Sequence, residues 1–81
     1  LYYPDFTILR KCDRNIILWE HFGMMDDQEY HEKTIEKINN YAECGYYPGI
    51  NLIMTTETRE EPFTASRAAE IIQKYLMQEQ I

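Results

Sequence analysis

Two apolar runs near the start of the chain are separated by a short polar segment, and this pattern predicts a β-hairpin. The runs cover residues 1–9 and 15–23, and the polar segment covers residues 11–15. Apolar runs of this length with a short polar connection are typical of paired antiparallel strands. The pairing matters for chemistry, because each run carries one carboxylate, Asp5 or Glu20, and a hairpin brings distant positions side by side.

The middle of the chain reads as a helix followed by a third strand. Asp26 or Asp27 can cap a helix over residues 28–44, whose apolar residues recur at helical spacing. Gly45 is suited to end that helix. After a turn, residues 50–56 are again strand-like.

A final helix follows a polar loop, with Thr64 or Ser66 as its cap and a stripe of apolar residues along it. The predicted order is β-β-α-β-α, in one α/β domain over residues 1–81. A strand, a crossover helix and a strand imply parallel neighbours. At least one strand edge stays open, so we expect the first run to be covered by a preceding strand, a missing domain or a second copy in a homodimer.

Composition favours a packed domain but opposes a nucleic-acid partner. Hydrophobic residues make up 44% of the chain and aromatic residues 14%, which indicates a core rather than disorder. No apolar run has the length of a membrane span, so we expect no membrane partner. The formal net charge of −6 disfavours contact with phosphates, which depends on Lys and Arg.

The two cysteines have no paired spacing. Free cysteines are typical of a reducing compartment, and they favour a cytoplasmic location. A zinc site that combines Cys12 and Cys44 with His21 and His31 stays an alternative, although no CxxC or HxxxH spacing supports it.

Three short motifs follow one another along the chain. Residues 3–6 contain a proline–aspartate pair, residues 17–23 contain an acid within an apolar strand, and Lys37-x-x-x-Tyr41 lies on the next helix. In this order they resemble the motifs of the PD-(D/E)XK nuclease superfamily. The resemblance implies a three-layer, restriction-endonuclease-like core. This chain would contain that core from its second strand onward, with the first helix and the first strand missing.

The resemblance also implies a metal site. Asp5 corresponds to the aspartate of the "PD" element, and Glu20 corresponds to the acid of the "(D/E)XK" element. In the family these acids bind Mg²⁺ or Mn²⁺, hard cations that prefer oxygen ligands. The backbone carbonyl of His21 is the further ligand that the family pattern implies.

The lysine of the motif is displaced in this chain. The family places it two residues after the acid, where this chain has Phe22. In some members it has moved to the following helix, which makes Lys37 the first candidate and Lys33 the second. Lys37 and Tyr41 also resemble the Q-x-x-x-Y element of one branch of the superfamily, with Lys in place of Gln. Tyr41 is then expected to contact the lysine or a DNA phosphate.

The function implied is metal-dependent hydrolysis of DNA by a nuclease domain of a larger protein, in short a Mg²⁺-dependent deoxyribonuclease. A bound metal orients the phosphate and lowers the pKa of a water, while a lysine stabilises the developing charge. The alternative is a catalytically inactive domain of the same fold that serves protein interaction or assembly. Phe22 at the lysine position and the acidic charge favour that alternative.

Each candidate residue also has an ordinary structural role. Glu20 can form a salt bridge with Lys33 or Lys37, since a buried acid needs a partner. Both lysines are flanked by glutamates, as on a solvated helix face. His21 and Tyr41 can serve core packing.

Overall fold

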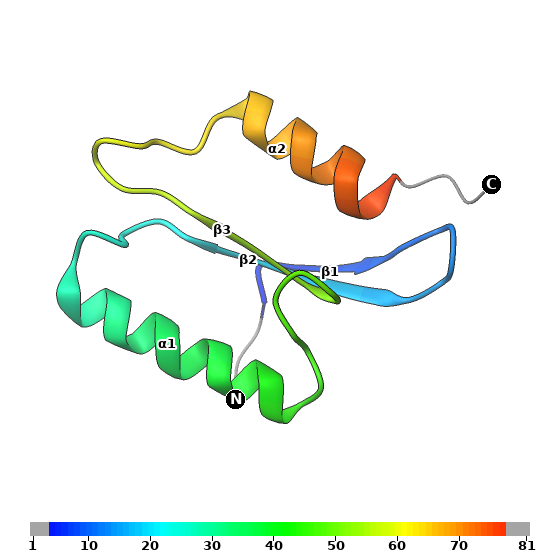
Figure 1. The fold of residues 1–81 in the computed structure, drawn as a ribbon, viewed down its shortest axis with the longest axis horizontal. Coiled ribbons are helices and arrows are strands. Elements are labelled where there is room, and N and C mark those ends of the chain that lie inside the picture. Colours follow the sequence, from blue (N-terminus) through cyan, green and yellow to red (C-terminus); the bar gives the residue numbers. More distant parts are fainter. Residues whose placement is uncertain (1–3, 78–81) are drawn as a thin grey trace.

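The computed structural model describes residues 4–77, which form a mixed three-stranded sheet with a helix on each face (Figure 1). The predicted α/β class and the order β-β-α-β-α are confirmed. The elements are β1 (Phe6–Leu9), β2 (Ile16–Phe22), α1 (Gln28–Glu43), β3 (Leu52–Thr56) and α2 (Ala65–Ile71), which continues as the π-helical turn η1 (Ile72–Leu76).

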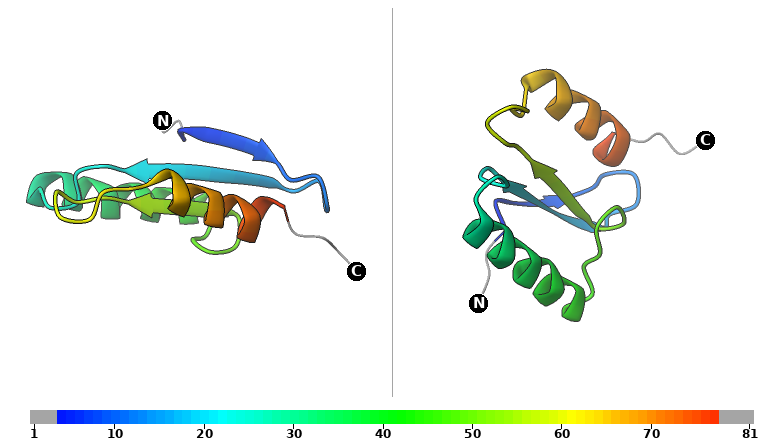
Figure 2. Two further views of the ribbon diagram at one scale, coloured as in Figure 1. Left: turned by 90° about the horizontal axis from the view of Figure 1, so that it is seen from above. Right: turned by 60° about the vertical axis from the view of Figure 1, so that its left-hand side comes forward.

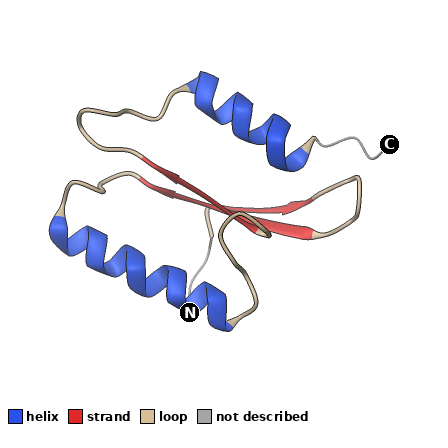
Figure 3. Cartoon of the chain, in the orientation of Figure 1, coloured by secondary structure: helices blue, strands red, loops and turns tan. Residues whose placement is uncertain are grey.

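The central strand β2 pairs with both of its neighbours. It runs antiparallel to β1, with Phe6 opposite Trp19, and parallel to β3, with Leu18 opposite Leu52. The strand order is therefore β1-β2-β3, and Figure 2 shows β1 along one edge of this sheet. The predicted hairpin and the predicted parallel crossover through α1 are both present, as the secondary-structure colours of Figure 3 also show.

Alternation along β2 divides the core into two clusters. Ile17 and Trp19 face α2, and they pack with Ile53 of β3. Leu18 faces α1, and it packs with Leu52 and with Tyr41 of that helix. Successive side chains of a strand point to opposite faces, so one strand serves both clusters. The result is three layers, with the sheet between the two helices.

The strands are shorter than the sequence pattern predicts. The first run was expected over residues 1–9, but its described part is a strand only over Phe6–Leu9. Pro4 has no N–H and cannot extend the ladder. Residues 1–3 lie outside the described part of the chain. The third strand begins at Leu52 rather than at residue 50, because the side chain of Asn51 joins the preceding turn: its Oδ1 accepts from the N–H of Tyr47 at 2.7 Å.

Side-chain caps begin both helices. Asp27, rather than Asp26, caps α1 and accepts a hydrogen bond from the N–H of Tyr30 at 2.9 Å. Thr64, rather than Ser66, caps α2 and accepts from the N–H of Arg67 at 3.2 Å. No helix within residues 4–77 combines the length and apolar character needed to cross a membrane.

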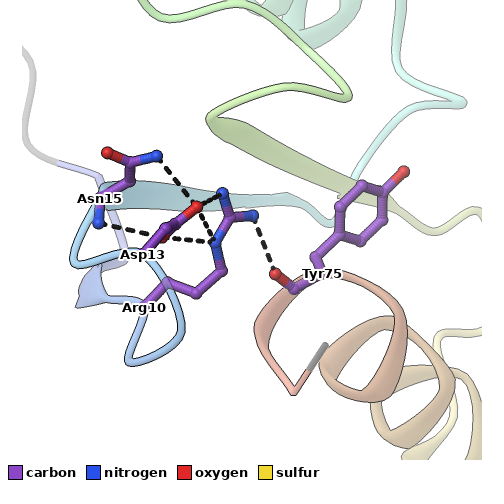
Figure 4. Close-up of polar contacts among 4 residues, drawn as sticks. All are labelled: Arg10, Asp13, Asn15 and Tyr75. Carbon is purple, nitrogen blue, oxygen red and sulfur yellow. Dashed lines mark hydrogen bonds and ion pairs between the residues drawn. The ribbon is translucent and has the colours of Figure 1, made fainter. Parts of the chain in front are cut away.

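A polar bridge joins the hairpin turn to the end of the last helix (Figure 4). The Nε of Arg10 donates to Asp13 at 3.0 Å, and its Nη1 donates to the carbonyl of Tyr75 at 3.2 Å. Asp13 also accepts from the backbone N–H of Asn15 at 3.1 Å. The hydrogen bond from Arg10, followed by that from Asn15, lowers the pKa of Asp13 to about 2. A cation is favourable at this position, because carbonyls gather at a helix C-terminus.

We predict that Leu52→Ala destabilises the domain by about 2–5 kcal/mol, because Leu52 is 1% exposed and truncation of a buried leucine leaves a cavity. Ile50→Ala is the matched control, since Ile50 is 69% exposed and should change stability by less than about 0.5 kcal/mol. Denaturant unfolding monitored by the fluorescence of Trp19 measures both variants. Equal losses in the two would contradict the assigned core.

We predict that Arg10→Gln returns the pKa of Asp13 toward its usual value of 3.8. Because that pKa is lowered in the folded state, the linked stability is present above pH about 4 and is lost as the pH falls toward about 2. Carboxyl-detected NMR titration follows Asp13, and amide hydrogen exchange follows residues 72–77, which should exchange faster in the variant. An unchanged titration in Arg10→Gln would show that Arg10 is not the cause.

Candidate active site

Strand pairing brings the two predicted carboxylates to the same end of the hairpin. Phe6, the first residue of β1, lies opposite Trp19, and Asp5 precedes it in a bend. Glu20 follows Trp19 on β2 and lies on the face that α1 covers. The side chain of Asp5 reaches the backbone of the next residue of β2, His21.

Pro4 and Asp5 together end the hairpin in an unusual way. At the other end of the hairpin, the carbonyl of Asn15 accepts a hydrogen bond from the N–H of Arg10 at 2.9 Å. The backbone groups of Asn15 therefore point toward the first strand. Alternation along β2 then directs the N–H and C=O of His21 toward β1 as well, opposite Pro4. Pro4 has no N–H, so the ladder supplies no donor to the His21 carbonyl from that position. The N–H of His21 is bonded by a side chain instead: it donates to the Oδ2 of Asp5 at 2.8 Å.

Glu20 is buried in the middle of this arrangement and is bonded by α1. It is 4% exposed, and its Oε1 accepts from the Nζ of Lys37 at 2.7 Å. Its Oε2 accepts from the hydroxyl of Tyr41 at 2.9 Å. Lys37 and Tyr41 lie four residues apart, one turn along the same helix face. The spacing of the Lys37-x-x-x-Tyr41 motif thus matches the two oxygens of a single carboxylate.

Burial and the two acids act on the hydroxyl of Tyr41 in the same direction. Burial raises the pKa of Tyr41 well above its usual value of 10, and the hydrogen bond to Glu20 and its negative charge raise this pKa further. The charge of Asp5 adds to the same rise. Both carboxylates therefore act on one phenol, although Asp5 itself lies on the exposed rim of the site.

The second lysine candidate lies elsewhere. Lys33 pairs with Glu29 at 3.5 Å, and both side chains are more than 70% exposed to solvent. The structure thus brings Lys37, and not Lys33, to Glu20. The expectation of a solvated pair along α1 fits Lys33, whereas the expectation of a salt bridge to Glu20 fits Lys37.

The imidazole of His21 points to the opposite face of the sheet. Its Nδ1 lies 2.8 Å from the Oγ1 of Thr55, and its Nε2 lies 3.1 Å from the Oε1 of Glu57. Thr55 also accepts from the indole N–H of Trp19 at 3.0 Å. A neutral ring with its proton on Nε2 satisfies all of these groups, because the threonine hydroxyl then donates to Nδ1. Only the backbone of His21 is directed toward the acid pair.

Thr55 and Glu57 were missed by the sequence reasoning. Thr55 is 2% exposed and lies opposite His21 in the parallel pair. Glu57 accepts from the N–H of Phe63 at 3.0 Å, and this bond, followed by that to His21, lowers the pKa of Glu57. Thr55 could have been found from its position, because it is a polar residue in an otherwise apolar strand. No comparable signal marked Glu57, because the loop around it is polar throughout.

The groups near Asp5 are oxygen donors, the kind of ligand that hard divalent cations prefer. Within residues 4–77, no cluster of three or more His, Cys, Asp or Glu side chains has the geometry of a metal site. Mg²⁺ is commonly bound by one or two carboxylates, with waters and substrate phosphates as its other ligands. Asp5, Glu20 and the carbonyl of His21 supply donors of that kind, with Glu20 already bonded to Lys37 and Tyr41. The predicted zinc alternative is not assembled in the described residues, where Cys12 and Cys44 are free.

No match was found when the chain was compared with protein-family models, with curated proteins and with solved structures. The site is therefore described by its own geometry.

We predict that Tyr41→Phe destabilises the domain by about 1–3 kcal/mol at neutral pH, because it removes a donor from a buried carboxylate. The raised pKa of Tyr41 also stabilises the fold below pH about 10, and this contribution falls above that pH as the unfolded chain loses the proton first. The difference in stability between wild type and Tyr41→Phe should therefore shrink from pH about 10 upward.

Denaturant unfolding at a series of pH values between about 7 and 11 measures this difference. Tyr47→Phe is the matched control, since Tyr47 is 49% exposed and should give a small difference that does not vary with pH. A constant difference for Tyr41→Phe over this range would contradict the buried, hydrogen-bonded phenol.

Proposed function

We propose that this domain hydrolyses phosphodiester bonds of DNA in a metal-dependent reaction. One observation carries the proposal: Asp5 is bonded to the N–H of His21, the residue next to Glu20 on β2, and the ammonium of Lys37 is 2.7 Å from Glu20. The choice of DNA comes from the resemblance of these residues to the PD-(D/E)XK nucleases. Acidic pairs beside one lysine are a recurrent arrangement for this chemistry.

Three groups of the chain would hold the cation: the carboxylates of Asp5 and Glu20, and the backbone carbonyl of His21. A bound Mg²⁺ or Mn²⁺ supplies a polarised phosphate and a water of lowered pKa. Lys37 would supply the positive charge that stabilises the phosphate oxygens in the transition state. Tyr41 keeps one oxygen of Glu20 in place by its hydrogen bond, which orients the carboxylate.

The charge of the chain limits how it meets DNA. A net charge of −6 repels a polyanion, so attraction must come from the local field of the cation and of Lys37. Further basic residues on a longer protein would serve the same purpose. We therefore propose that this domain supplies the groups for hydrolysis and that basic residues of a longer protein supply most of the phosphate contacts.

A second candidate function is a catalytically inactive domain that serves assembly. The specific observation in its favour is that Lys37 and Tyr41 occupy both oxygens of Glu20. Such a closed network stabilises the contact between sheet and helix without any cation. Phe22 at the usual lysine position agrees with this alternative.

Metal titration separates the two functions. We predict that wild type binds Mn²⁺, followed by calorimetry or by the paramagnetic relaxation of water protons, and that Asp5→Asn and Glu20→Gln each weaken this binding at least about tenfold. Glu29→Gln is the control, because it removes an acid from the exposed side of α1. If wild type binds Mn²⁺ no more tightly than both acid variants, the metal site is rejected and the inactive domain is favoured.

We predict that Lys37→Met retains Mn²⁺ binding but lowers DNA cleavage by about 10²–10³-fold, the usual cost of removing one group that stabilises transition-state charge. Cleavage of single-stranded and double-stranded DNA by wild type, Lys37→Met and the control Lys33→Met measures this effect. Lys33→Met should cleave like wild type. Equal cleavage by wild type and Lys37→Met would exclude the proposed role of Lys37.

A further inference from the structure

His21 is held at several points, although its side chain faces away from the candidate site. Its backbone N–H donates to the Oδ2 of Asp5 at 2.8 Å. On the opposite face, its Nδ1 lies 2.8 Å from the Oγ1 of Thr55, and its Nε2 lies 3.1 Å from the Oε1 of Glu57. The ring also packs on Phe63, with 4.9 Å between the two ring centroids. The proposed hydrolysis makes no direct use of these contacts of the imidazole.

Both side chains that bond the ring are themselves held in place. Thr55 is 2% exposed, and its Oγ1 also accepts from the indole N–H of Trp19 at 3.0 Å. The second carboxylate oxygen of Glu57 accepts from the N–H of Phe63 at 3.0 Å. The backbone N–H of Glu57 donates to the carbonyl of Phe22 at 3.0 Å. Because these anchors belong to β3 and to the loop that follows it, the imidazole joins β2 to the neighbouring strand on the face of α2.

The backbone of His21 lacks the support that a residue in mid-strand receives. The carbonyl of Phe22 accepts from the N–H of Glu57, the residue after β3, so Phe22 bonds toward β3. Neighbouring residues of a strand direct their backbone groups to opposite sides, so His21 directs both of its groups toward β1. The ladder has ended there, because Asp5 lies in a bend and Pro4 has no N–H. A strand end of this kind opens locally more readily than the middle of a sheet.

We propose that Thr55 and Glu57 are positioning residues of the candidate site, which act on it from the opposite face of the sheet through the imidazole of His21. By holding His21, they hold the N–H that bonds Asp5 and the carbonyl that the proposed cation would use. Groups that orient a metal ligand in this way commonly change metal affinity by about 10–100-fold. The effect on the cation rests on the proposed function, whereas the link from these two residues to Asp5 does not.

Amide hydrogen exchange of the metal-free protein, followed by NMR, tests the link between the two faces. Thr55→Val removes a hydroxyl without a change of charge, and Glu57→Ala removes the other partner of the ring. Each should accelerate exchange of the His21 amide at least about fivefold, because this strand end then opens more often. Ile17→Val is the control, since it shortens a buried side chain on the same face and leaves the ring contacts intact. It should change the exchange rate of that amide less than about twofold, because local opening does not depend on general stability.

Manganese binding tests the consequence for the site. His21→Ala removes both ring contacts and keeps the backbone carbonyl, so it should weaken Mn²⁺ binding at least about fivefold. His21→Gln should recover part of this loss, because its amide nitrogen can donate to Glu57 in place of Nε2. Thr55→Val should weaken binding as His21→Ala does, with no change of charge. Glu60→Ala removes an exposed acid from the same loop as Glu57→Ala, so it is the control for charge and should bind like wild type.

Either of two results would overturn the proposal. The first is a His21 amide that exchanges at the wild-type rate in Thr55→Val and Glu57→Ala, or that is accelerated as strongly by the control Ile17→Val. The second is a wild type that binds Mn²⁺ no more tightly than Thr55→Val and His21→Ala bind it. A wild type without measurable Mn²⁺ binding rejects the proposed function and, with it, the role toward the cation. In that case the exchange rates alone decide whether Thr55 and Glu57 position His21 and Asp5.

Discussion

The buried carboxylate of Glu20 is the constraint on which the arrangement of sheet and helix depends. A charged group that is 4% exposed lowers stability unless ionic and hydrogen-bonding partners surround it. Lys37 and Tyr41 supply those partners, and both come from α1. The helix can therefore slide or rotate very little on the sheet, because a shift of one turn would separate both donors from the acid.

Polar chemistry is concentrated at one end of the sheet. Glu20 and His21 lie near the carboxyl end of β2, and Thr55 and Glu57 lie near the carboxyl end of the parallel strand β3. Glu20 faces α1, whereas the side chain of His21 points to the other face and contacts Thr55 and Glu57, since alternation sends neighbours on a strand to opposite sides. The other end of β2 is apolar and packs the core. In α/β sheets, the carboxyl ends of parallel strands are the usual place for ligands, and the two polar networks of this domain lie at that end.

Much of the fold could be predicted from the sequence, because local patterns determine it. The hairpin and the parallel crossover follow from spacing and turn chemistry, which also narrow each helix cap to two candidate residues. Positions that depend on tertiary register could not be predicted in the same way. Lys33 and Lys37 lie on neighbouring turns of one helix, and only the axial position of α1 against β2 decides which of them reaches Glu20. The partners of His21 depend likewise on the parallel register of β3, which no local pattern encodes. No local pattern marks the π-helical end of the last helix, Ile72–Leu76, either.

Pro4 has a consequence that reaches beyond the length of one strand. An ordinary residue there would donate its amide to the carbonyl of His21 and would close the hairpin by one more rung. The imino acid has no such proton, so this rung of the ladder offers no donor to the peptide oxygen of the neighbouring strand. Under the proposed function, that main-chain oxygen is the ligand that no substitution at position 21 can remove.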